Sequence, residues 1–133
     1  MRVDHIAIAV NDASKALENY KKILKIDRVE YEEVPSEKVK VVMINLEDSR
    51  LELLEPMDDT SPISKFLKER GEGIHHVAIT ADEIESDVSK AMDNGMRFLG
   101  DIRTGSYGRK ITFIHPKSLN GVLIEFCQAP PQH

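Results

Sequence analysis

The sequence VDHIAIAV at residues 3–10 returns in altered form as IHHVAITA at residues 74–81. In both segments aliphatic residues alternate with small or polar ones, which is typical of a β-strand with one apolar face. Each segment is followed by a stretch of helical periodicity. Each half of the chain then ends in an apolar segment with a central glutamate, RLELLEP at residues 50–56 and VLIEFC at residues 122–127. The pattern indicates an internal duplication.

The first copy is predicted to run strand, helix and then three strands. A helix over residues 13–25 follows the first strand, and Asn11 or Asp12 offers its N-cap. Further strands are expected at 28–34, 39–46 and 50–55, with Pro35-Ser36 marking the first break between them. A second helix connects the copies, because Ser61-Pro62 favours a helix start and Gly71 a helix end.

The second copy repeats this order. A strand at 75–81 is followed by a helix at 83–94, with Met92 on its buried face, and by strands at 96–102, 111–115 and 122–127. Asn120-Gly121 favours a tight turn before the last strand. We therefore predict an α+β fold in which two tandem β-α-β-β-β modules have curved mixed sheets that form a cup around a cleft. The expected organisation is a single domain over residues 1–133, with module one at 1–57, a linker helix at 58–72 and module two at 73–129.

The composition argues against two classes of protein, general nucleic-acid binders and membrane-spanning proteins. The net charge of −5 disfavours a general nucleic-acid binder, which needs a basic surface to neutralise phosphates. No apolar run approaches the roughly 20 residues that span a bilayer. The single cysteine, Cys127, suits a reducing compartment, and the N-terminus does not resemble a signal peptide. We expect a cytoplasmic protein that binds neither nucleic acid nor membrane, with Cys127 as a packed strand residue.

Strand alternation fixes the direction of four polar side chains. His5 and His76 share a face with small residues, whereas Glu52 and Glu125 point away from the aliphatic neighbours on their strands. The histidines are 71 positions apart and the glutamates 73, so the two pairs keep nearly the same offset. The aliphatic faces are expected to pack on helices, which leaves the four polar side chains on the concave side.

These four side chains suit a divalent metal ion. A buried carboxylate without compensation is costly, and two carboxylates neutralise one dication. Two imidazoles with two carboxylates favour a borderline metal such as Zn, Co, Ni or Mn, and an octahedral ion would keep two positions for water or substrate. His75 is predicted to point elsewhere, and His115, at a strand end, is a second-rank candidate ligand. A lone strand histidine is more often structural, so the prediction depends on the matched set of four.

The chain resembles the vicinal-oxygen-chelate superfamily and, within it, the methylmalonyl-CoA epimerases. The matching stretches span almost the whole chain: DHIAIAV at 4–10, ELLEP at 52–56, SPISKFL at 61–67, GIHHVA at 73–78, FIHPK at 113–117 and GVLIE at 121–125. The Ser-Pro-Ile helix and the His-Pro-Lys segment are more specific than the ligand pattern, which glyoxalase I shares.

This resemblance implies epimerisation of (R)- and (S)-methylmalonyl-CoA by 1,1-proton transfer through a metal-stabilised enolate. It places the metal ligands on His5, Glu52, His76 and Glu125, with Co preferred and Zn, Ni or Mn as alternatives. Glu125 is implied to act as a base as well as a ligand. The second base is implied to come from residues 32–37, where Glu37 is our prediction and Ser36 occupies a competing alignment. For any one glutamate of this segment, a solvated turn is the commoner role.

Three basic residues are candidates for substrate binding. Arg109 and Lys110 belong to a Gly-rich loop at 104–110, and Lys117 follows His115-Pro116. They are expected to bind a CoA phosphate or the substrate carboxylate, although a solvated loop explains each residue alone equally well. The resemblance further implies an acyl-CoA substrate and a homodimer.

Two other functions compete with the epimerase prediction. A glyoxalase I-like lactoylglutathione lyase would use the same metal and similar proton chemistry on a hemithioacetal. A non-enzymatic small-ligand-binding module of the same fold would need no metal, and the retention of all four candidate ligands argues against it.

Overall fold

The computed structural model describes residues 1–130 and contains two compact units. The first unit comprises residues 5–75, and the second comprises residues 1–4 together with the chain from residue 76 onward. The element order, β-α-β-β-β followed by a linking helix and a second β-α-β-β-β series, confirms the predicted α+β duplication. The predicted single-domain organisation with its module boundaries stays a prediction.

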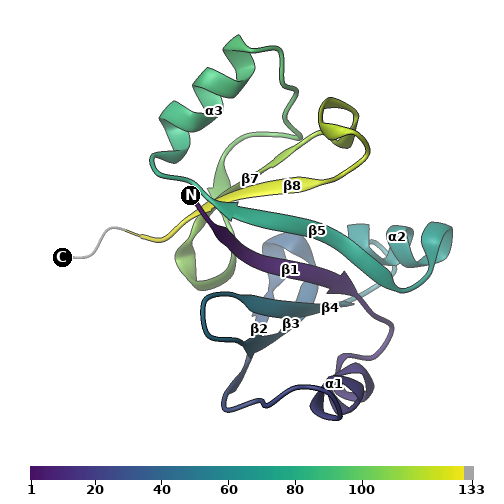
Figure 1. Ribbon diagram of the computed structural model, residues 1–133. Helices are drawn as coiled ribbons and strands as arrows, with labels where there is room; N and C mark the ends of the chain where they lie inside the picture. Colours follow the sequence, from purple (N-terminus) through teal and green to yellow (C-terminus); the bar gives the residue numbers. More distant parts are fainter. Residues whose placement is uncertain (131–133) are drawn as a thin grey trace. The chain divides into compact units, whose positions relative to one another are not determined.

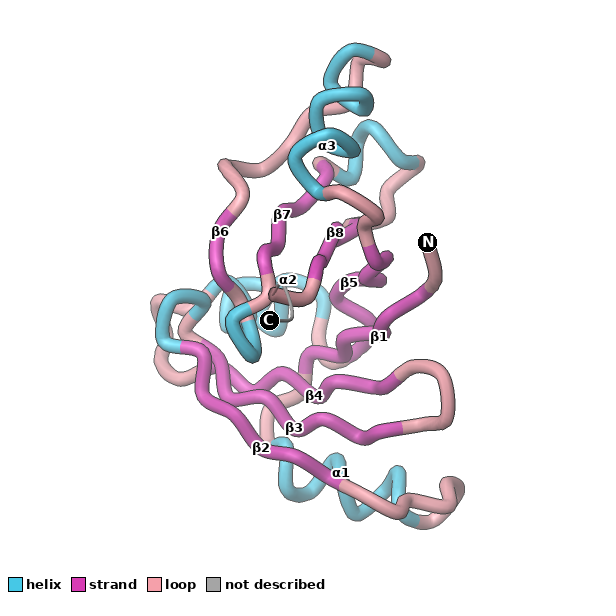
Figure 2. Tube along the Cα trace, turned by 90° about the vertical axis from the view of Figure 1, so that its left-hand side faces the viewer, coloured by secondary structure: helices cyan, strands magenta, loops and turns pink. Residues whose placement is uncertain are grey.

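The first unit contains a mixed sheet with the strand order β2-β3-β4-β1 (Figure 1). Strands β1 and β4 are parallel, and the other neighbours are antiparallel. Figure 2 shows β2, β3 and β4 side by side, with α1 along one side of them. The elements are β1 (Val3–Ala9), α1 (Ala13–Lys21), β2 (Val29–Val34), β3 (Val39–Asn45), β4 (Arg50–Pro56) and α2 (Pro62–Arg70).

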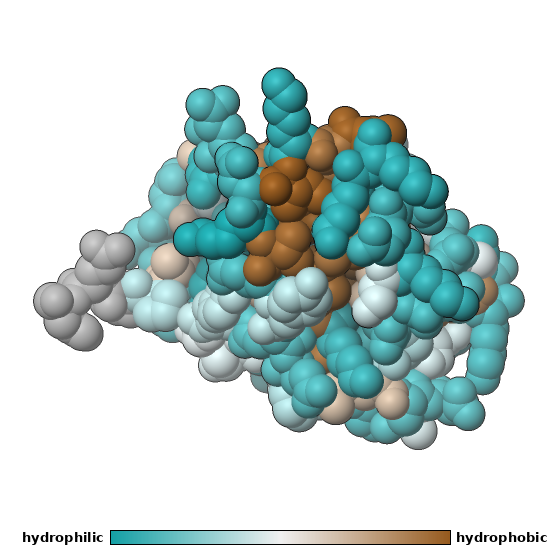
Figure 3. All heavy atoms as spheres, turned by 90° about the horizontal axis from the view of Figure 1, so that it is seen from below, coloured by the Kyte–Doolittle hydropathy of each residue, from teal (hydrophilic) through white to brown (hydrophobic). Residues whose placement is uncertain are grey.

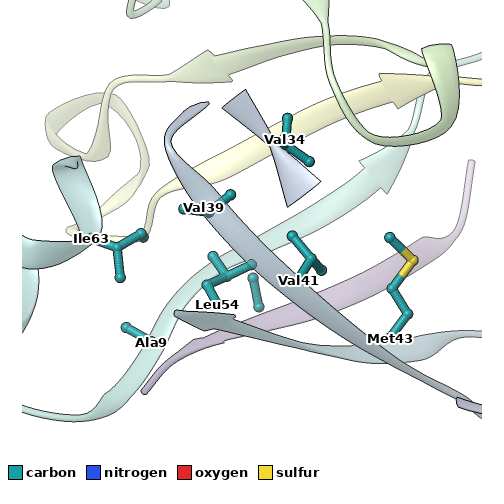
Figure 4. Packing of buried hydrophobic residues seen from close by; sticks show 8 residues of the cluster. Ala9, Val34, Val39, Val41, Met43, Leu54 and Ile63 are labelled. Carbon is teal, nitrogen blue, oxygen red and sulfur yellow. The ribbon is translucent and has the colours of Figure 1, made fainter. Parts of the chain in front are cut away.

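The two faces of this sheet are covered by different helices. One face, which includes Ile44 and Leu53, packs against Leu17 of α1. Hydrophobic residues of the other face pack against Ile63 of α2, and Figure 4 shows Ile63 close to Ala9. The expectation that the aliphatic face of this copy packs on its helix is confirmed. The cluster drawn in Figure 4 comprises Ala7, Ala9, Val34, Val39, Val41, Met43, Leu54 and Ile63.

Local signals set the start of α1 and both ends of α2 as predicted. Asp12 is the N-cap of α1 and its side chain accepts a hydrogen bond from the Lys15 N–H at 3.1 Å. Ser61 caps α2, with Pro62 in the first turn, and Gly71 ends it with a φ of 76°. A left-handed backbone suits glycine, which has no Cβ to clash with the following carbonyl.

The second unit repeats the mixed sheet in the order β5-β8-β7-β6. Strands β5 and β8 are parallel, while β7 is antiparallel to both β8 and β6. A tight turn at Asn120-Gly121 precedes β8, and both residues have positive φ angles, as predicted. The elements are β5 (Gly73–Thr80), α3 (Ile84–Asp93), β6 (Arg103–Thr104), β7 (Lys110–Ile114) and β8 (Ile124–Gln128).

The structure corrects three local predictions. Helix α1 ends at Lys21 rather than 25, although Leu24 still packs beside it. Residues 96–102 do not form a strand; only Phe98 makes an isolated bridge to Ile114, and the positive φ of Gly100 interrupts the extended backbone. Met92 is 55% exposed rather than buried, because α3 is covered only along the side that includes Ile84.

Hydrophilic side chains cover most of the face drawn in Figure 3, with a band of hydrophobic atoms between them. This is the surface expected for a chain with 31% charged residues. Within residues 1–130, no helix has the length and apolarity that crossing a membrane requires.

Leu53 provides a test of the packing against α1, because its side chain is fully buried. We predict that Leu53→Ala lowers the free energy of unfolding by about 3 kcal/mol, through lost burial and the cavity that remains. Urea unfolding followed by circular dichroism measures this change. Ile23→Ala is the control, because Ile23 is 76% exposed. Equal stability of the two variants would contradict the assigned core.

Candidate active site

In the first unit, His5 and Glu52 form a buried pair. The parallel register sets Ala7 of β1 beside Glu52 of β4, so the small alanine leaves room for the carboxylate. The His5 Nδ1 atom lies 3.3 Å from Glu52 Oε2, and each side chain is only 5% exposed. Strand alternation therefore predicted correctly that these two side chains share a face.

Arg50 contacts the His5–Glu52 pair, although it was not among the predicted site residues. Its Nε donates a hydrogen bond to Glu52 Oε2 at 2.7 Å, and its side chain is 15% exposed. The signal was present in the sequence, because residues two apart on a strand point to the same face. The equivalent position of the second copy holds Leu123, two residues before Glu125, so the two copies are not chemically symmetric.

In the second unit, His76 and Glu125 form the corresponding pair. The His76 Nε2 atom lies 3.2 Å from Glu125 Oε1, and both side chains are 6% exposed. Ala78 and Phe113 flank Glu125 on the neighbouring strands. The Phe113 ring packs edge-on against the His76 ring at a centroid distance of 5.2 Å. Each copy thus brings together the histidine and the glutamate that its sequence pattern predicted.

The other predicted side chains have structural partners. The His75 ring packs edge-on against Phe66 at 5.0 Å, in agreement with its ranking as a non-ligand. His115, the second-rank candidate ligand, caps a short 3-10 turn. Its Nδ1 accepts a hydrogen bond from the Lys117 N–H at 3.0 Å, so this side chain has a structural role. Cys127 is buried among core residues, as expected.

The acidic segment places its glutamates on different surfaces. Glu37 is half-buried, and it is the last residue of the short 3-10 turn Pro35–Glu37 that follows β2. Glu32 lies opposite Val41 in the β2–β3 ladder, on the face that also carries Met43 and Glu52. Glu33, on the opposite face, is exposed. By register, Glu32 therefore shares a sheet face with the His5–Glu52 pair.

The Gly-rich loop of the second unit is tightly folded. The Gly105 N–H donates to the Arg109 carbonyl oxygen at 2.8 Å, and Tyr107 adopts a left-handed backbone with a φ of 56°. A Cβ at Gly105 would lie 2.8 Å from Ile111 Cδ1, so this position requires glycine or a shifted isoleucine. The loop is consequently a formed structure and not an open flexible segment.

The three predicted substrate-binding cations differ in their surroundings. Arg109 Nη1 donates to Asp4 Oδ2 at 2.8 Å, and both side chains are largely buried. Lys110 is exposed and pairs with Glu85, and its hydrogen bond is the main cause that lowers the pKa of that carboxyl. Lys117 is also exposed, at the start of the turn after β7. Asp4 was not predicted, because it lies 105 positions from Arg109.

Comparison with known proteins places this arrangement in a family. Residues 4–113 match the Glyoxalase/Bleomycin resistance protein/Dioxygenase superfamily. The mitochondrial methylmalonyl-CoA epimerase of Homo sapiens is 39% identical over 130 residues, covering 96% of this chain and 74% of the relative. The chain belongs to the methylmalonyl-CoA epimerase family.

Solved structures of this family extend the comparison. The methylmalonyl-CoA epimerase of Mycobacterium tuberculosis is 31% identical with a TM-score of 0.92, covering 98% of this chain and 89% of that one. A Streptomyces coelicolor methylmalonyl-CoA epimerase in complex with 2-nitronate-propionyl-CoA is 34% identical, with a TM-score of 0.88 and coverage of 98% and 99%. The family fold is thus shared over almost the entire chain.

Asp4 and Arg109 provide a test of how the Gly-rich loop is held. We predict that Asp4→Asn lowers the free energy of unfolding by about 3 kcal/mol, because a largely buried guanidinium loses its carboxylate. The double variant Asp4→Asn, Arg109→Met should recover part of this loss, since it removes the uncompensated charge. Urea unfolding of the four proteins in this cycle measures the coupling. Additive effects of the two substitutions would contradict a direct ion pair.

Proposed function

We propose that this protein is a metal-dependent methylmalonyl-CoA epimerase. The observation that carries the proposal is the pair of buried His–Glu contacts, one in each copy of the duplicated sequence. Membership of the methylmalonyl-CoA epimerase family supports the substrate class. The reaction would move one proton at the carbon between the thioester carbonyl and the carboxylate.

The ligand set proposed is His5, Glu52, His76 and Glu125, around one divalent ion. Two ligands at right angles, each about 2.1 Å from a metal, lie about 3 Å apart. The N–O separations of 3.3 Å and 3.2 Å within the two His–Glu pairs fit this spacing. We favour Co by family resemblance, with Zn, Ni or Mn as alternatives. When bound, such an ion would supply a positive charge that stabilises the negative charge developing on the thioester oxygen.

Glu125 is proposed as one of two proton-transfer groups. Its Oε1 faces His76, and its carboxylate has a second oxygen with which to take a proton. Epimerisation also needs a base on the other side of the reacting carbon, within about 2.6–3.2 Å of the proton. That base is proposed to come from residues 32–37. The resemblance favours Glu37, whereas the β2–β3 register favours Glu32.

The CoA portion is proposed to bind at the Gly-rich loop and the turn after β7. Lys110 and Lys117 are exposed and suited to phosphate groups, whereas Arg109 contributes by fixing the loop through Asp4.

A cytoplasmic location and a homodimer are also part of the proposal. Analytical ultracentrifugation tests the number of subunits.

Metal binding is tested with the two adjacent histidines. We predict that the protein, dialysed against chelator and reloaded, holds one Co or Zn ion per chain. His76→Ala should weaken binding at least about 10-fold, because it removes a proposed ligand. His75→Ala is the matched control and should bind normally, since His75 packs against Phe66. Equal metal affinity of the two variants would remove His76 from the site.

Proton transfer is tested by deuterium incorporation from solvent into methylmalonyl-CoA. Wild-type protein with metal should exchange the proton, and Glu125→Gln should lower the rate at least about 100-fold even where metal is retained. Of Glu32→Gln and Glu37→Gln, the variant that loses epimerisation identifies the second base. Glu18→Gln on α1 is the control, because Glu18 is exposed and pairs with Lys21 at the surface. Turnover of a hemithioacetal without exchange would indicate a glyoxalase instead.

A further inference from the structure

The His115 ring is held in one tautomer by the backbone of the turn that follows it. Its Nδ1 accepts a hydrogen bond from the Lys117 N–H at 3.0 Å. A backbone N–H can only donate, so Nδ1 carries no proton while this bond is made, and the proton of the neutral ring lies on Nε2. His115 therefore presents an N–H donor on the other side of its ring. This Nε2 atom has no hydrogen-bond partner among residues 1–130.

This tautomer is unsuited to metal binding. A histidine that binds a metal through one ring nitrogen carries a proton on the other, and it usually donates that proton to a carboxylate, a carbonyl oxygen or water. In His115 the arrangement is reversed, because Nδ1 is the acceptor and Nε2 holds the proton. The geometry thus disfavours His115 as a metal ligand and suits it to donate a hydrogen bond to an oxygen atom of a ligand.

The strand register assigns His115 to the sheet face that carries His76 and Glu125. Phe113 of β7 lies opposite Glu125 of β8, which lies opposite Ala78 of β5. His115 is two residues after Phe113, and His76 is two residues before Ala78, so both histidines belong to this face. Continued by one residue, the ladders set the two histidines in the same row, with β8 between them. At the usual strand spacing this row separates their Cα atoms by about 10 Å.

The backbone of His115 is fixed on both sides. Its own N–H donates to the Arg97 carbonyl oxygen at 2.7 Å, and its carbonyl oxygen accepts from the Ser118 N–H at 2.9 Å. The residue is half-buried at the end of β7. A donor held in this way loses little conformational freedom when a ligand binds, which is the advantage of a preorganised binding group.

The position of this donor matches the middle of an acyl-CoA molecule. In the proposed function the thioester oxygen binds beside His76, and the CoA phosphates bind near Lys117. The pantetheine arm then runs between these two points, and its hydrogen-bond acceptors include amide carbonyl oxygens. His115 shares a row with His76 and is two residues before Lys117, so it lies along this path. The amide nearer the sulfur fits the short separation from His76 better than the amide farther along the arm.

We propose that the His115 Nε2–H donates a hydrogen bond to the pantetheine amide carbonyl oxygen nearer the sulfur. This inference rests on the proposed epimerase function and adds a residue that recognises the carrier arm of the substrate. An imidazole N–H and an amide carbonyl oxygen form an ordinary hydrogen bond with a heavy-atom distance of about 2.9 Å. The contact distinguishes thioesters of pantetheine from simple alkyl thioesters.

The test compares two methylmalonyl thioesters that differ in this amide. The N-acetylcysteamine thioester carries the amide nearer the sulfur, whereas the S-pentyl thioester has a carbon chain of matched length without it. Deuterium incorporation from solvent gives kcat/KM for each thioester with the metal-loaded protein, and methylmalonyl-CoA is the full-length reference. Wild-type protein should prefer the N-acetylcysteamine thioester over the S-pentyl thioester.

Two variants separate the hydrogen bond to the substrate from the cap on the turn. His115→Asn keeps an acceptor for the Lys117 N–H, because asparagine is a favoured cap, but its shorter side chain has no donor at the Nε2 position. It should lower kcat/KM about 3-fold to 10-fold for the N-acetylcysteamine thioester and for methylmalonyl-CoA, and less than about twofold for the S-pentyl thioester. His115→Gln places an amide N–H near the Nε2 position without the cap, and it should retain part of the preference for the amide.

The outcomes separate this inference from the proposed function. Equal loss on both small thioesters in His115→Asn, or no loss on either, overturns the contact with the arm. Loss of metal from His115→Asn after reloading would make His115 a ligand and also overturns it. Where circular dichroism shows His115→Asn to be unfolded, His115→Gln decides, since a lost preference for the amide overturns the contact and a retained one supports it.

The wild type tests the epimerase function on its own. Wild-type protein that exchanges the proton of none of the three thioesters overturns that function itself. Exchange by the wild type together with an unchanged His115→Asn leaves the epimerase function standing and removes only the contact between His115 and the pantetheine arm.

Discussion

A carboxylate that leaves water must find compensation for its charge, and this constraint acts on both closing strands of the protein. Glu52 and Glu125 each lie on a strand between aliphatic or aromatic neighbours, and each is almost fully buried. An unpaired ionised carboxylate in such a place is strongly disfavoured. The alternation of the strands directs both glutamates to the face that also carries a histidine. In the first unit α1 covers the opposite face, which includes Ile44 and Leu53, whereas Ile63 of α2 packs against hydrophobic residues on the same face as Glu52.

The two copies meet this constraint differently. In the first, Arg50 donates a hydrogen bond to Glu52 Oε2 and holds that carboxylate in place. In the second, Leu123 occupies the equivalent position and cannot donate, while Phe113 packs beside the pair. The two glutamates of the duplicated pattern therefore differ in the side chains beside them, although each is buried next to a histidine.

The sequence predicted those features that depend on local period or on capping. The His–Glu pairs followed from strand alternation, and α2 followed from Ser61, Pro62 and Gly71, because each acts on the backbone within a few residues. Residues 96–102 have strand-like composition, but the left-handed Gly100 prevents a continuous strand there. The Asp4–Arg109 contact joins residues 105 positions apart, and no spacing rule connects them. The two His–Glu pairs were therefore predictable from the sequence, whereas the long-range contact between Asp4 and Arg109 was not.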